Sequence, residues 1–371
     1  ALVAERRHAR RVEVIAMEDV YKQLARRLDE LPNGFPSTET GLEITILKKI
    51  FSREDAEMAL KLKPIPETVE AISERLGLER ENMQAILDAM VEKGQIGSTR
   101  MYGNQVYMLA PFIFGIYEFQ LNRLDKELSD LVGAYAPTFM RTLGAYAPAL
   151  SRVVPVNAQI RGKHQVHRYE DAQAMMEDAR SFQVMECICR KDRALHGHPC
   201  SHDTEVCLAI SSHENAFDRY PMGRIISREE ALRVIARAEE QGLVHTTYNV
   251  QSEHLYMCNC CSCCCGLLRG MKYFKVPHLI AGSNFRAVIN TDTCQACGMC
   301  ATERCPVNGI AEEQGVYRVL PERCIGCGVC TSTCPTESIA LVRKPEHEQD
   351  EPPQDVLDWF SRKADNRGIK I

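Results

Sequence analysis

The sequence lacks the common short signatures of catalysis and nucleotide binding. No glycine-rich dinucleotide fingerprint follows an expected strand, no phosphate-binding loop is present, and no Ser-His-Asp order suggests a catalytic triad. We therefore expect the chain to bind neither a flavin nor a nicotinamide itself, and we assign no catalytic residue. An excess of positive charge is also missing, because 45 Lys and Arg face 50 Asp and Glu, so bulk electrostatics does not indicate a nucleic-acid partner.

Long hydrophobic segments are missing as well. The longest apolar run, residues 106–117, is interrupted by Pro111 and Gly115 and is too short to span a bilayer. No basic-then-apolar signal opens the printed sequence. These features predict a cytoplasmic protein without membrane insertion, although a folded partner could still carry it across a membrane.

Cysteine is what the sequence has in excess. Eighteen cysteines are present among 371 residues, far more than packing requires. The length predicts two or three domains, and a hydrophobic fraction of 45% is ample for their cores. Disulfides do not persist in a reducing compartment, so metal binding or redox chemistry is the expected use of these thiols.

Eight of the cysteines belong to a motif that occurs twice near the C-terminus. Each copy has three cysteines separated by two residues, then a fourth cysteine followed directly by proline. Two intervening residues let the chain curl around a metal centre, so that three sulfurs converge on one cluster. The proline then turns the chain, which carries the fourth cysteine away from that cluster and toward the other one. Eight thiolates at this spacing indicate two iron–sulfur clusters and electron transfer.

Residues 286–344, which contain both copies, resemble the bacterial two-cluster ferredoxins. The resemblance implies two 4Fe–4S clusters with ligands exchanged between the copies: Cys294, Cys297, Cys300 and Cys334 for the first, and Cys305, Cys324, Cys327 and Cys330 for the second. Four residues separate Cys300 from Cys305 where the family has three. We expect a one-residue bulge there.

The other ten cysteines lie in two groups upstream, and we expect both groups to bind metal. A third cluster is expected on Cys187, Cys189, Cys200 and Cys207. A fourth is expected on four of the six residues Cys258, Cys260, Cys261, Cys263, Cys264 and Cys265. Six cysteines in eight positions are not a core, because packing needs volume and adjacent residues point in different directions. Nearby cations would offset the thiolate charge: Arg190, Lys191, Arg269 and Lys272.

Two other groupings of these ten cysteines stay open. Ligands from both groups could mix around one extra cluster, with the remaining thiols free. Alternatively, zinc, a less favoured metal, could occupy the first group with help from His196, His198, His202 or His213. The run Cys264-Cys265-Gly266 is also similar to the cysteine-rich motif of heterodisulfide reductases, which implies an unusual catalytic cluster.

Residues 38–110 resemble a winged-helix domain. Three amphipathic helices are expected, the third over residues 81–93 with Met83, Ile86, Leu87 and Met90 inward, followed by two strands around a turn at 102–104. The third helix would be the DNA-recognition helix, but acidic residues outnumber basic ones on it, and phosphates would repel it. We therefore expect this domain to bind protein and not nucleic acid.

The sequence as a whole predicts an α+β multidomain protein: a winged-helix-like N-terminal domain, a cysteine-rich α/β middle region and a C-terminal ferredoxin-like two-cluster domain. The expected segments are an N-terminal helical arm (1–37), the winged-helix-like domain (38–110), a helical linker or docking segment (111–150), the cysteine-rich metal-binding domain (151–285), the two-cluster domain (286–344) and a polar C-terminal tail (345–371). In the tail, Trp359 and Phe360 either dock on a partner or pack back on the protein.

The function expected from these features is that of an iron–sulfur electron-transfer subunit. It would pass electrons between a flavin- or metal-containing partner, such as a flavoprotein, and a terminal acceptor in a cytoplasmic redox complex. One alternative is a redox enzyme with a catalytic cluster at Cys258–Cys265. A second is an iron–sulfur redox sensor that uses the winged helix to bind DNA.

Overall fold

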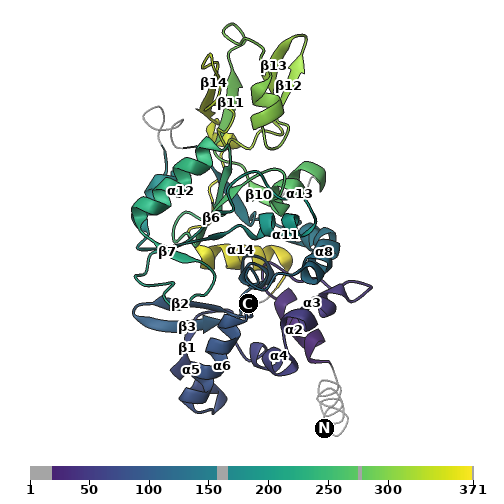
Figure 1. Ribbon diagram of the computed structural model, residues 1–371, viewed down its shortest axis with the longest axis vertical. Helices are drawn as coiled ribbons and strands as arrows, with labels where there is room; N and C mark the ends of the chain where they lie inside the picture. The colour runs from purple at the N-terminus through teal and green to yellow at the C-terminus, as the bar shows by residue number, and fades with distance from the viewer. Residues whose placement is uncertain (1–18, 157–165, 275–277, 370–371) are drawn as a thin grey trace. The chain divides into compact units, whose positions relative to one another are not determined.

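The structure is a computed structural model that describes residues 19–156, 166–274 and 278–369 (Figure 1). It divides into two compact units. The N-terminal unit comprises residues 1–98 and 106–139, and the C-terminal unit comprises residues 99–105 and 140–371. The helix expected over residues 1–31 is observed as α2 (Val20–Asp29), and residues 1–18 lie outside the described residues. The six segments drawn from the sequence stay a prediction.

Helices dominate the N-terminal unit. They are α2, α3 (Leu42–Ile50), α4 (Arg53–Ala59), α5 (Val69–Leu76), α6 (Arg80–Glu92), the π-helical turn η1 (Phe112–Ile116), α7 (Tyr117–Phe119) and most of α8 (Lys126–Gly144). Three short strands form a sheet in the order β1-β3-β2: β1 (Glu67–Thr68), β2 (Gly97–Met101) and β3 (Asn104–Met108), of which residues 99–105 are counted with the C-terminal unit. Leu24, Ile46 and Ile72 are fully buried, so the apolar faces of α2, α3 and α5 supply the core.

All three helices expected between residues 38 and 110 are present, together with one that the sequence analysis missed. The missed helix is α4, where the Ser52 hydroxyl accepts a hydrogen bond from the Asp55 N–H at 3.1 Å. Three of the four residues expected inward on α6 are buried, but Ile86 is 38% exposed, so that part of the prediction is wrong. Ile86 lies at the edge of the apolar stripe. The assignment to the winged-helix fold stays a prediction.

Helix α8 contains the first copy of a short repeat, residues 133–137, but not the second, residues 144–148. Tyr135, in the first copy, is buried, and its hydroxyl donates to the Pro36 carbonyl oxygen at 2.8 Å. The helix ends at Gly144, and Tyr146 in the second copy is exposed. The two copies of the repeat therefore do not form one continuous helix.

A seven-stranded sheet organises the middle of the C-terminal unit. Its order is β10-β4-β8-β9-β6-β5-β7, with β10 and β4 parallel and the other neighbours antiparallel. The strands are β4 (Ser151–Val154), β5 (Ser181–Glu186), β6 (Glu205–Ser211), β7 (Arg224–Ile226), β8 (Val244–Tyr248), β9 (Tyr256–Cys260) and β10 (Ile280–Ala281). The accompanying helices are η2 (Arg168–Glu170), α10 (Ala172–Asp178), α11 (Ile188–Leu195), α12 (Arg228–Glu240) and α13 (Gly266–Phe274).

The two faces of this sheet carry different side chains. On one face, α10 and α12 pack over a core that includes Met176, Leu208 and Met257. Side chains alternate between faces along a strand, so Cys207 and Cys258, each next to one of these core residues, project from the other face. The strand alternation therefore separates an apolar core from a face that presents sulfur.

The C-terminal helix α14 (Val356–Arg367) packs on the same unit. Trp359 is fully buried, and its indole Nε1–H donates to the Ala149 carbonyl oxygen at 2.8 Å. Its ring meets the Tyr248 ring edge-on at 5.1 Å. Lys363 is buried too, and its ammonium group donates to three backbone carbonyl groups. Of the two placements open for Trp359, packing on the protein is the one observed.

The two C-terminal cysteine motifs lie between two small antiparallel sheets. One sheet pairs β11 (Phe285–Ile289) with β14 (Ile339–Arg343), and the other pairs β12 (Ile310–Glu313) with β13 (Val316–Val319). Two short helical turns complete the region: η3 (Cys300–Arg304) and η4 (Glu346–Glu348). Phe285, Leu341 and other apolar residues of the strands pack against the cysteine side chains.

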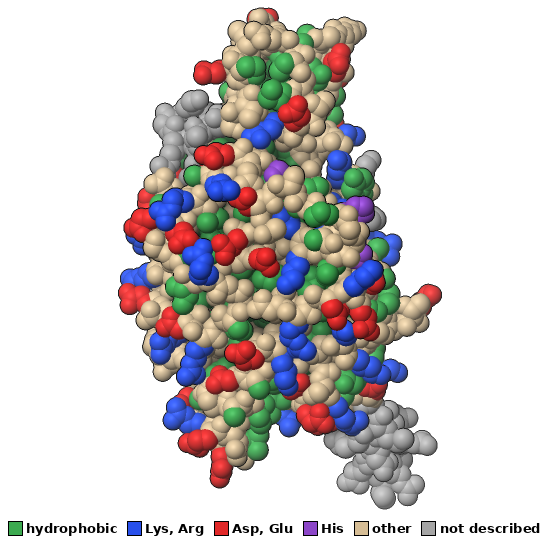
Figure 2. All heavy atoms as spheres, viewed as in Figure 1, with side chains coloured by type: hydrophobic (Ala, Val, Ile, Leu, Met, Phe, Trp, Pro, Cys, Tyr) green, Lys and Arg blue, Asp and Glu red, His purple; other side chains and the backbone are tan. Residues whose placement is uncertain are grey.

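The surface shows no strong bias of charge on the face drawn in Figure 2, where basic and acidic side chains are interspersed. Within the described residues, no helix combines the length and the apolar character that crossing a membrane requires.

Candidate metal centres

The first C-terminal motif gathers with one cysteine of the second. Burial raises the pKa of the Cys300 thiol, and the nearby charges of Cys294, Cys297 and Cys334 raise it further. Of these four residues, Cys334 comes from the other motif. We call the four the outer set, because Cys297 is exposed and none of them is fully buried.

The inner set consists of Cys305, Cys324, Cys327 and Cys330. Burial raises the pKa of the Cys327 thiol to about 12, and the charges of Cys305 and Cys324 add to the effect. Cys330 is affected by the same neighbours. The positions of the two sets are compatible with the ligand exchange that the ferredoxin resemblance implies, although ligation itself stays a prediction.

Both motifs curl through left-handed residues at matching positions. Gly298 and Gly328 have φ of +78°, and the residues two positions earlier, Ala296 and Gly326, have φ of +54° and +67°. A Cβ atom at Gly326 would lie 2.1 Å from the Phe285 carbonyl oxygen. The inner motif therefore needs glycine at this position, whereas the outer motif has alanine.

The extra residue of the first motif is accommodated by the π-helical turn η3. The Cys305 N–H donates to the Cys300 carbonyl oxygen at 3.0 Å, so five residues close the turn instead of four. The Cys305 sulfur then accepts a hydrogen bond from the Gly309 N–H at 3.0 Å. The expected one-residue bulge is confirmed, and its form is a π-turn.

The inner motif is hydrogen-bonded to the backbone of the middle region. The Val156 N–H donates to the Cys327 carbonyl oxygen at 3.0 Å. The Ser283 N–H donates to the Ile325 carbonyl oxygen at 3.0 Å, and its hydroxyl donates to the Gly326 carbonyl oxygen at 2.7 Å. The inner set thus adjoins the middle region, while the outer set includes an exposed cysteine.

Six cysteines of the middle region form a closed ring of neighbouring thiols. Each sulfur interacts with the one before it and the one after it, in the order Cys187, Cys207, Cys258, Cys260, Cys265 and Cys189. We call this group the sulfur ring. Its members come from β6, β9, the first turn of α11 and the residues directly before α11 and α13.

Two members of the sulfur ring have pKa values well below that of an ordinary thiol. Hydrogen bonds from Cys189 and Cys207 lower the pKa of Cys187, and hydrogen bonds from Cys189 and Cys260 lower that of Cys265. Both stand at helix N-termini: Cys187 is the N-cap residue of α11, and a backbone N–H of α13 donates to the Cys265 sulfur. These two thiols therefore lose their protons most readily, whereas neighbouring thiols and burial raise the pKa of the other four ring members.

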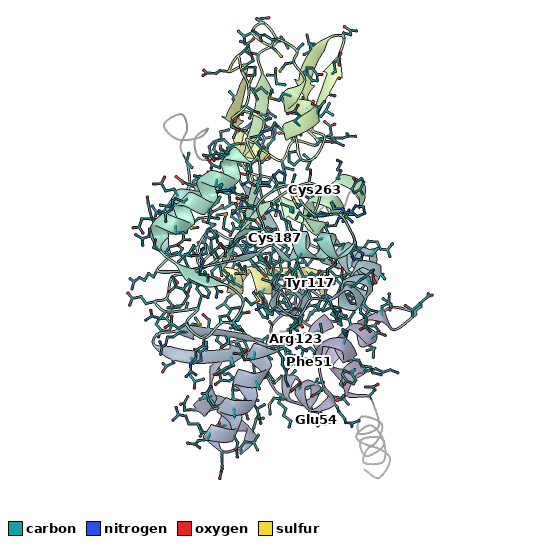
Figure 3. The ribbon with its side chains drawn as sticks, in the orientation of Figure 1. Phe51, Glu54, Tyr117, Arg123, Cys187 and Cys263 are labelled. Atoms are coloured by element: carbon teal, nitrogen blue, oxygen red, sulfur yellow. The ribbon has the colours of Figure 1, made fainter. Side chains whose placement is uncertain are left out.

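The other four cysteines form a second, tighter group, which we call the compact set: Cys200, Cys261, Cys263 and Cys264. Within the described residues, this is the one group of three or more His, Cys, Asp or Glu side chains whose ligand atoms all lie within 4.8 Å of one another. Cys263 is exposed and Cys261 and Cys264 are buried. Figure 3 labels one member of each group, Cys187 of the sulfur ring and Cys263 of the compact set.

Arg190 interacts with both groups. Its side chain is 1% exposed, and its Nη2 donates to the Asn259 carbonyl oxygen at 3.0 Å. Burial alone would lower the pKa of the guanidinium, but the thiolates of Cys187 and Cys261 raise it above its usual value. Arg190 therefore places a fixed positive charge beside both sulfur groups, as expected from the sequence.

The structure brings the ten cysteines together differently from the grouping drawn from sequence order. Cys200, expected with Cys187, Cys189 and Cys207, lies instead beside three members of the later run. The other three members of that run belong to the sulfur ring. The run is split because consecutive residues leave the backbone in different directions. Which of these residues bind metal stays a prediction.

Three details of these sites add to this comparison. Cys187 is the N-cap residue of α11 and has an extended backbone, and Cys189 lies in the first turn of that helix. The compact set contains no histidine, and His213, one of the four candidates, packs edge-on against Tyr102 at 4.6 Å. Sequence reasoning also missed Asn259, which holds the buried His245 ring through Oδ1 and Nδ1 at 2.6 Å. The sequence did offer one signal for Asn259, which is its position between Cys258 and Cys260, two cysteines on the same face of β9.

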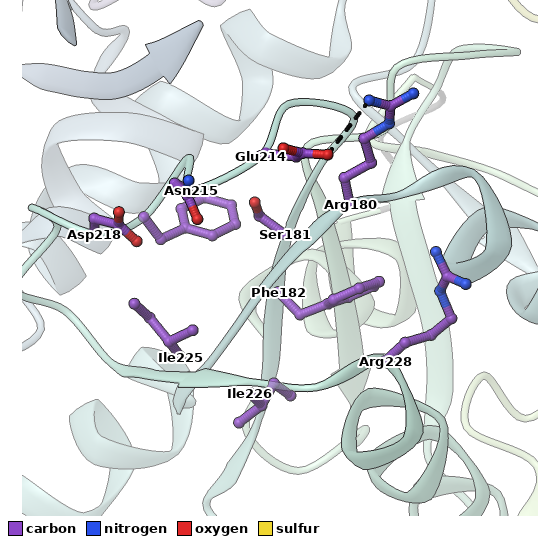
Figure 4. Close-up of a pocket in the computed structure, with 10 residues that line it drawn as sticks. Arg180, Ser181, Phe182, Glu214, Asn215, Asp218, Ile225, Ile226 and Arg228 are labelled. Carbon is purple, nitrogen blue, oxygen red and sulfur yellow. Dashed lines mark ion pairs between the residues drawn. The ribbon is translucent and has the colours of Figure 1, made fainter. Parts of the chain in front are cut away.

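A cavity of about 420 Å³ lies at the other end of β5 from Cys187. Figure 4 shows Phe182, Ile225 and Ile226 along its wall and an ion pair between Arg180 and Glu214 at 3.6 Å. Its lining includes no cysteine or histidine. Redox chemistry in this protein is therefore not expected there.

Comparison with known proteins identifies the C-terminal region. Residues 286–335 match the family described as 4Fe-4S dicluster domain. The chain is 29% identical over 85 residues to "Electron transport protein HydN" of Escherichia coli, covering 22% of this chain and 45% of that protein. It is 38% identical over 63 residues to "Ferredoxin-1" of Caulobacter vibrioides, covering 17% and 52%, and 33% identical over 58 residues to "Ferredoxin" of Streptomyces griseus, covering 16% and 49%.

These matches confirm a ferredoxin-like domain with the sequence of a 4Fe–4S dicluster domain. The chain spans about half the length of the curated relatives it matches. Eight free thiols in two sets of four suit the eight iron sites of two cubanes, so the residues present fit the cofactor.

Proposed function

We propose that this chain is an iron–sulfur electron-transfer subunit that exchanges electrons with a protein partner at its outer set and serves a second redox centre in its middle region. When bound, 4Fe–4S clusters accept and release single electrons. Cys294, Cys297, Cys300 and Cys334 would hold one cluster, and Cys305, Cys324, Cys327 and Cys330 the other. The similarity to electron-transport and ferredoxin proteins supports this proposal.

One observation carries the proposal: the two sets have different surroundings. The outer set includes the exposed Cys297, where a partner protein can approach. The inner set includes the buried Cys327, whose carbonyl group is hydrogen-bonded to the middle region through Val156. The chain's own contacts thus give the dicluster domain one side open to a partner and one side in contact with the middle region. A flavoprotein or a metal-containing protein is the partner we propose.

Iron counting on the full chain, prepared without oxygen, tests whether the middle region holds a further iron–sulfur centre. Two cubanes account for about eight iron atoms per chain, and we expect a content of about 12 or more because the sulfur ring adds its own centre. Replacing Cys258 with Ser should remove the excess above eight and leave the dicluster spectrum unchanged. A content near eight in the unaltered chain would contradict this part of the proposal.

A second candidate function, a redox enzyme with its active centre in the middle region, is favoured by the number of thiols in the sulfur ring. Six cysteines exceed the four terminal ligands of one cubane, so the centre there would differ from an ordinary relay cluster. A substrate that changes the electron paramagnetic resonance spectrum of that centre alone would favour this candidate. A full chain that is reducible and unresponsive to any substrate, yet co-purifies in a complex, would favour the electron-transfer subunit.

The winged-helix-like segment is proposed to dock a protein partner and not DNA. The solvent-facing side of α6 carries Glu81 and Glu92, which phosphates would repel, together with the apolar Ile86 and with Arg80, which pairs with Glu70 at 2.7 Å. The full chain should therefore leave duplex DNA unshifted at low salt. Binding that weakens steeply as salt rises would contradict this proposal, because phosphate contacts produce that dependence.

A further inference from the structure

The compact set differs from the cluster-binding sets in the spacing of its sulfur atoms. The Cys200 sulfur lies 3.7 Å from that of Cys261 and 3.8 Å from that of Cys263, and the sulfurs of Cys263 and Cys264 are 3.7 Å apart. All four sulfurs lie within 4.8 Å of one another. This spacing is a geometric property of the chain, independent of any assumption about the metal.

A single tetrahedral ion requires this spacing. Zinc–sulfur bonds of about 2.3 Å at tetrahedral angles place the ligand sulfurs about 3.8 Å apart. A cubane requires larger distances between its ligand sulfurs, because each terminal sulfur binds a different iron and the iron atoms are themselves separated. Four sulfurs as close as those of the compact set therefore surround one ion and not a four-iron cluster.

The outer and inner sets provide an internal comparison. Both belong to the region that matches the 4Fe-4S dicluster domain, and neither is compact enough for three of its sulfurs to lie mutually within 4.8 Å, all eight cysteines being among the described residues. Within one chain, the sets with a cluster-binding sequence are thus wide and the compact set is narrow. The sulfur spacing of each set therefore matches the kind of metal centre that the set can hold.

We propose that Cys200, Cys261, Cys263 and Cys264 bind one zinc ion with four sulfur ligands. Four protein ligands close the coordination shell, as in structural zinc sites, and an all-thiolate set favours zinc among the common divalent ions. The ion ties the loop before β6, which carries Cys200, to the turn between β9 and α13, which carries the other three. Arg190 offsets the net negative charge of such a site.

This zinc site has a structural consequence for the sulfur ring. Cys260 and Cys265, two ring members, directly flank the turn that carries Cys261, Cys263 and Cys264. The Cys265 N–H donates to the Cys261 carbonyl oxygen at 3.1 Å, which closes that turn on itself. Zinc at the compact set therefore positions two thiols of the neighbouring redox centre without taking part in electron transfer.

Metal analysis combined with zinc X-ray absorption on the full chain, prepared without oxygen, tests the inference. We expect one zinc ion per chain, with four sulfur ligands at about 2.3 Å and no nitrogen or oxygen ligand. Replacing Cys263 with Ser, at the exposed ligand, should lower the zinc content at least severalfold while the iron of the dicluster domain is retained. Ser262→Ala, at the adjacent residue outside the set, is the matched control and should keep the zinc.

Three results would overturn the inference. The unaltered chain could contain no zinc, its zinc could show nitrogen or oxygen ligands, or Cys263→Ser could retain zinc and lose iron instead. If Cys263→Ser fails to fold, Cys200→Ser tests the same site from the other segment, and the absorption spectrum of the unaltered chain needs no variant. Zinc content is measured separately from iron reduction, so failure here is distinguishable from failure of the proposed electron transfer.

Discussion

The dicluster domain and the middle region use cysteine in opposite ways. In the dicluster domain, each set takes three cysteines from one short motif and a fourth from the other, so the sequence order already indicates the sets. In the middle region, the sulfur ring and the compact set draw on segments as far apart as Cys187 and Cys265. The first arrangement depends on local turns, and the second depends on the folding of a whole sheet.

This difference determines how each region should respond to change. A local motif curls through left-handed turns, so a backbone substitution at one of these turns acts mainly on one set. The sulfur ring needs β6, β9 and two helix starts at once, so it forms only when the sheet has formed. We therefore expect damage in the dicluster domain to stay confined to one cluster, and damage in the middle region to spread.

The largest expected effect comes from Cys334→Ser. Cys334 interacts with Cys300 of the outer set, so its loss should remove the cluster built on the first motif, about four iron atoms per chain. The cluster built on the second motif, to which Cys334 belongs in sequence, should remain. Iron analysis and electron paramagnetic resonance of the reduced full chain measure both outcomes.

Cys305→Ser is the mirror-image control for this exchange. Cys305 belongs to the first motif in sequence but interacts with Cys324 and Cys327, so the inner cluster should be lost and the outer one retained. If each variant instead destroys the cluster of its own motif, the ligands are not exchanged.

The sequence predicted the dicluster domain well because its information is local. The spacing of Cys294, Cys297 and Cys300, and even the bulge before Cys305, could be interpreted without knowledge of the rest of the fold. The middle region was predicted only as a place where thiols gather. The neighbours of Cys200 could not be deduced, because they depend on how the loop before β6 folds over a turn that follows 61 residues later in the chain. Ile86 was misplaced for a separate reason: a helical pattern does not define where the edge of an apolar stripe lies.

Glu170→Ala should produce the next largest effect, at the joint between the two regions. Glu170 is 1% exposed and accepts from Arg343 of β14 at 2.6 Å. Removing the carboxylate leaves a partly buried guanidinium without this partner, which costs about 3 kcal/mol. The shift of the anaerobic denaturation midpoint, followed through the cluster absorbance, measures this loss.

An exposed bridge in the dicluster domain supplies the control for Glu170→Ala. Glu348 accepts from Arg286 at 3.1 Å, and both side chains are substantially exposed. Glu348→Ala should therefore cost at most about 1 kcal/mol. Equal effects of the two variants would show that the Glu170 bridge does not join the regions.

A smaller and local effect is expected from Gly326→Ala in the inner motif. The new Cβ atom would lie 2.1 Å from the Phe285 carbonyl oxygen, at a backbone φ of +67° that L side chains disfavour. We expect a loss of more than about 1 kcal/mol and a faster release of iron from the inner cluster than from the outer one. Equal release from both clusters would contradict the proposed dependence on this close approach.

The reverse change, Ala296→Gly in the outer motif, should have the smallest effect. Ala296 adopts φ of +54°, which costs an L residue about 1–2 kcal/mol, and glycine would relieve that cost. Glycine also gives the unfolded chain more freedom, worth about 0.4–1 kcal/mol in the opposite direction. The net change should lie between zero and about 1.6 kcal/mol in favour of the folded state. A measurable loss of outer-cluster stability would mean that the alanine methyl group makes a contact with the cluster or with a partner, and that the two motifs differ in more than their surroundings.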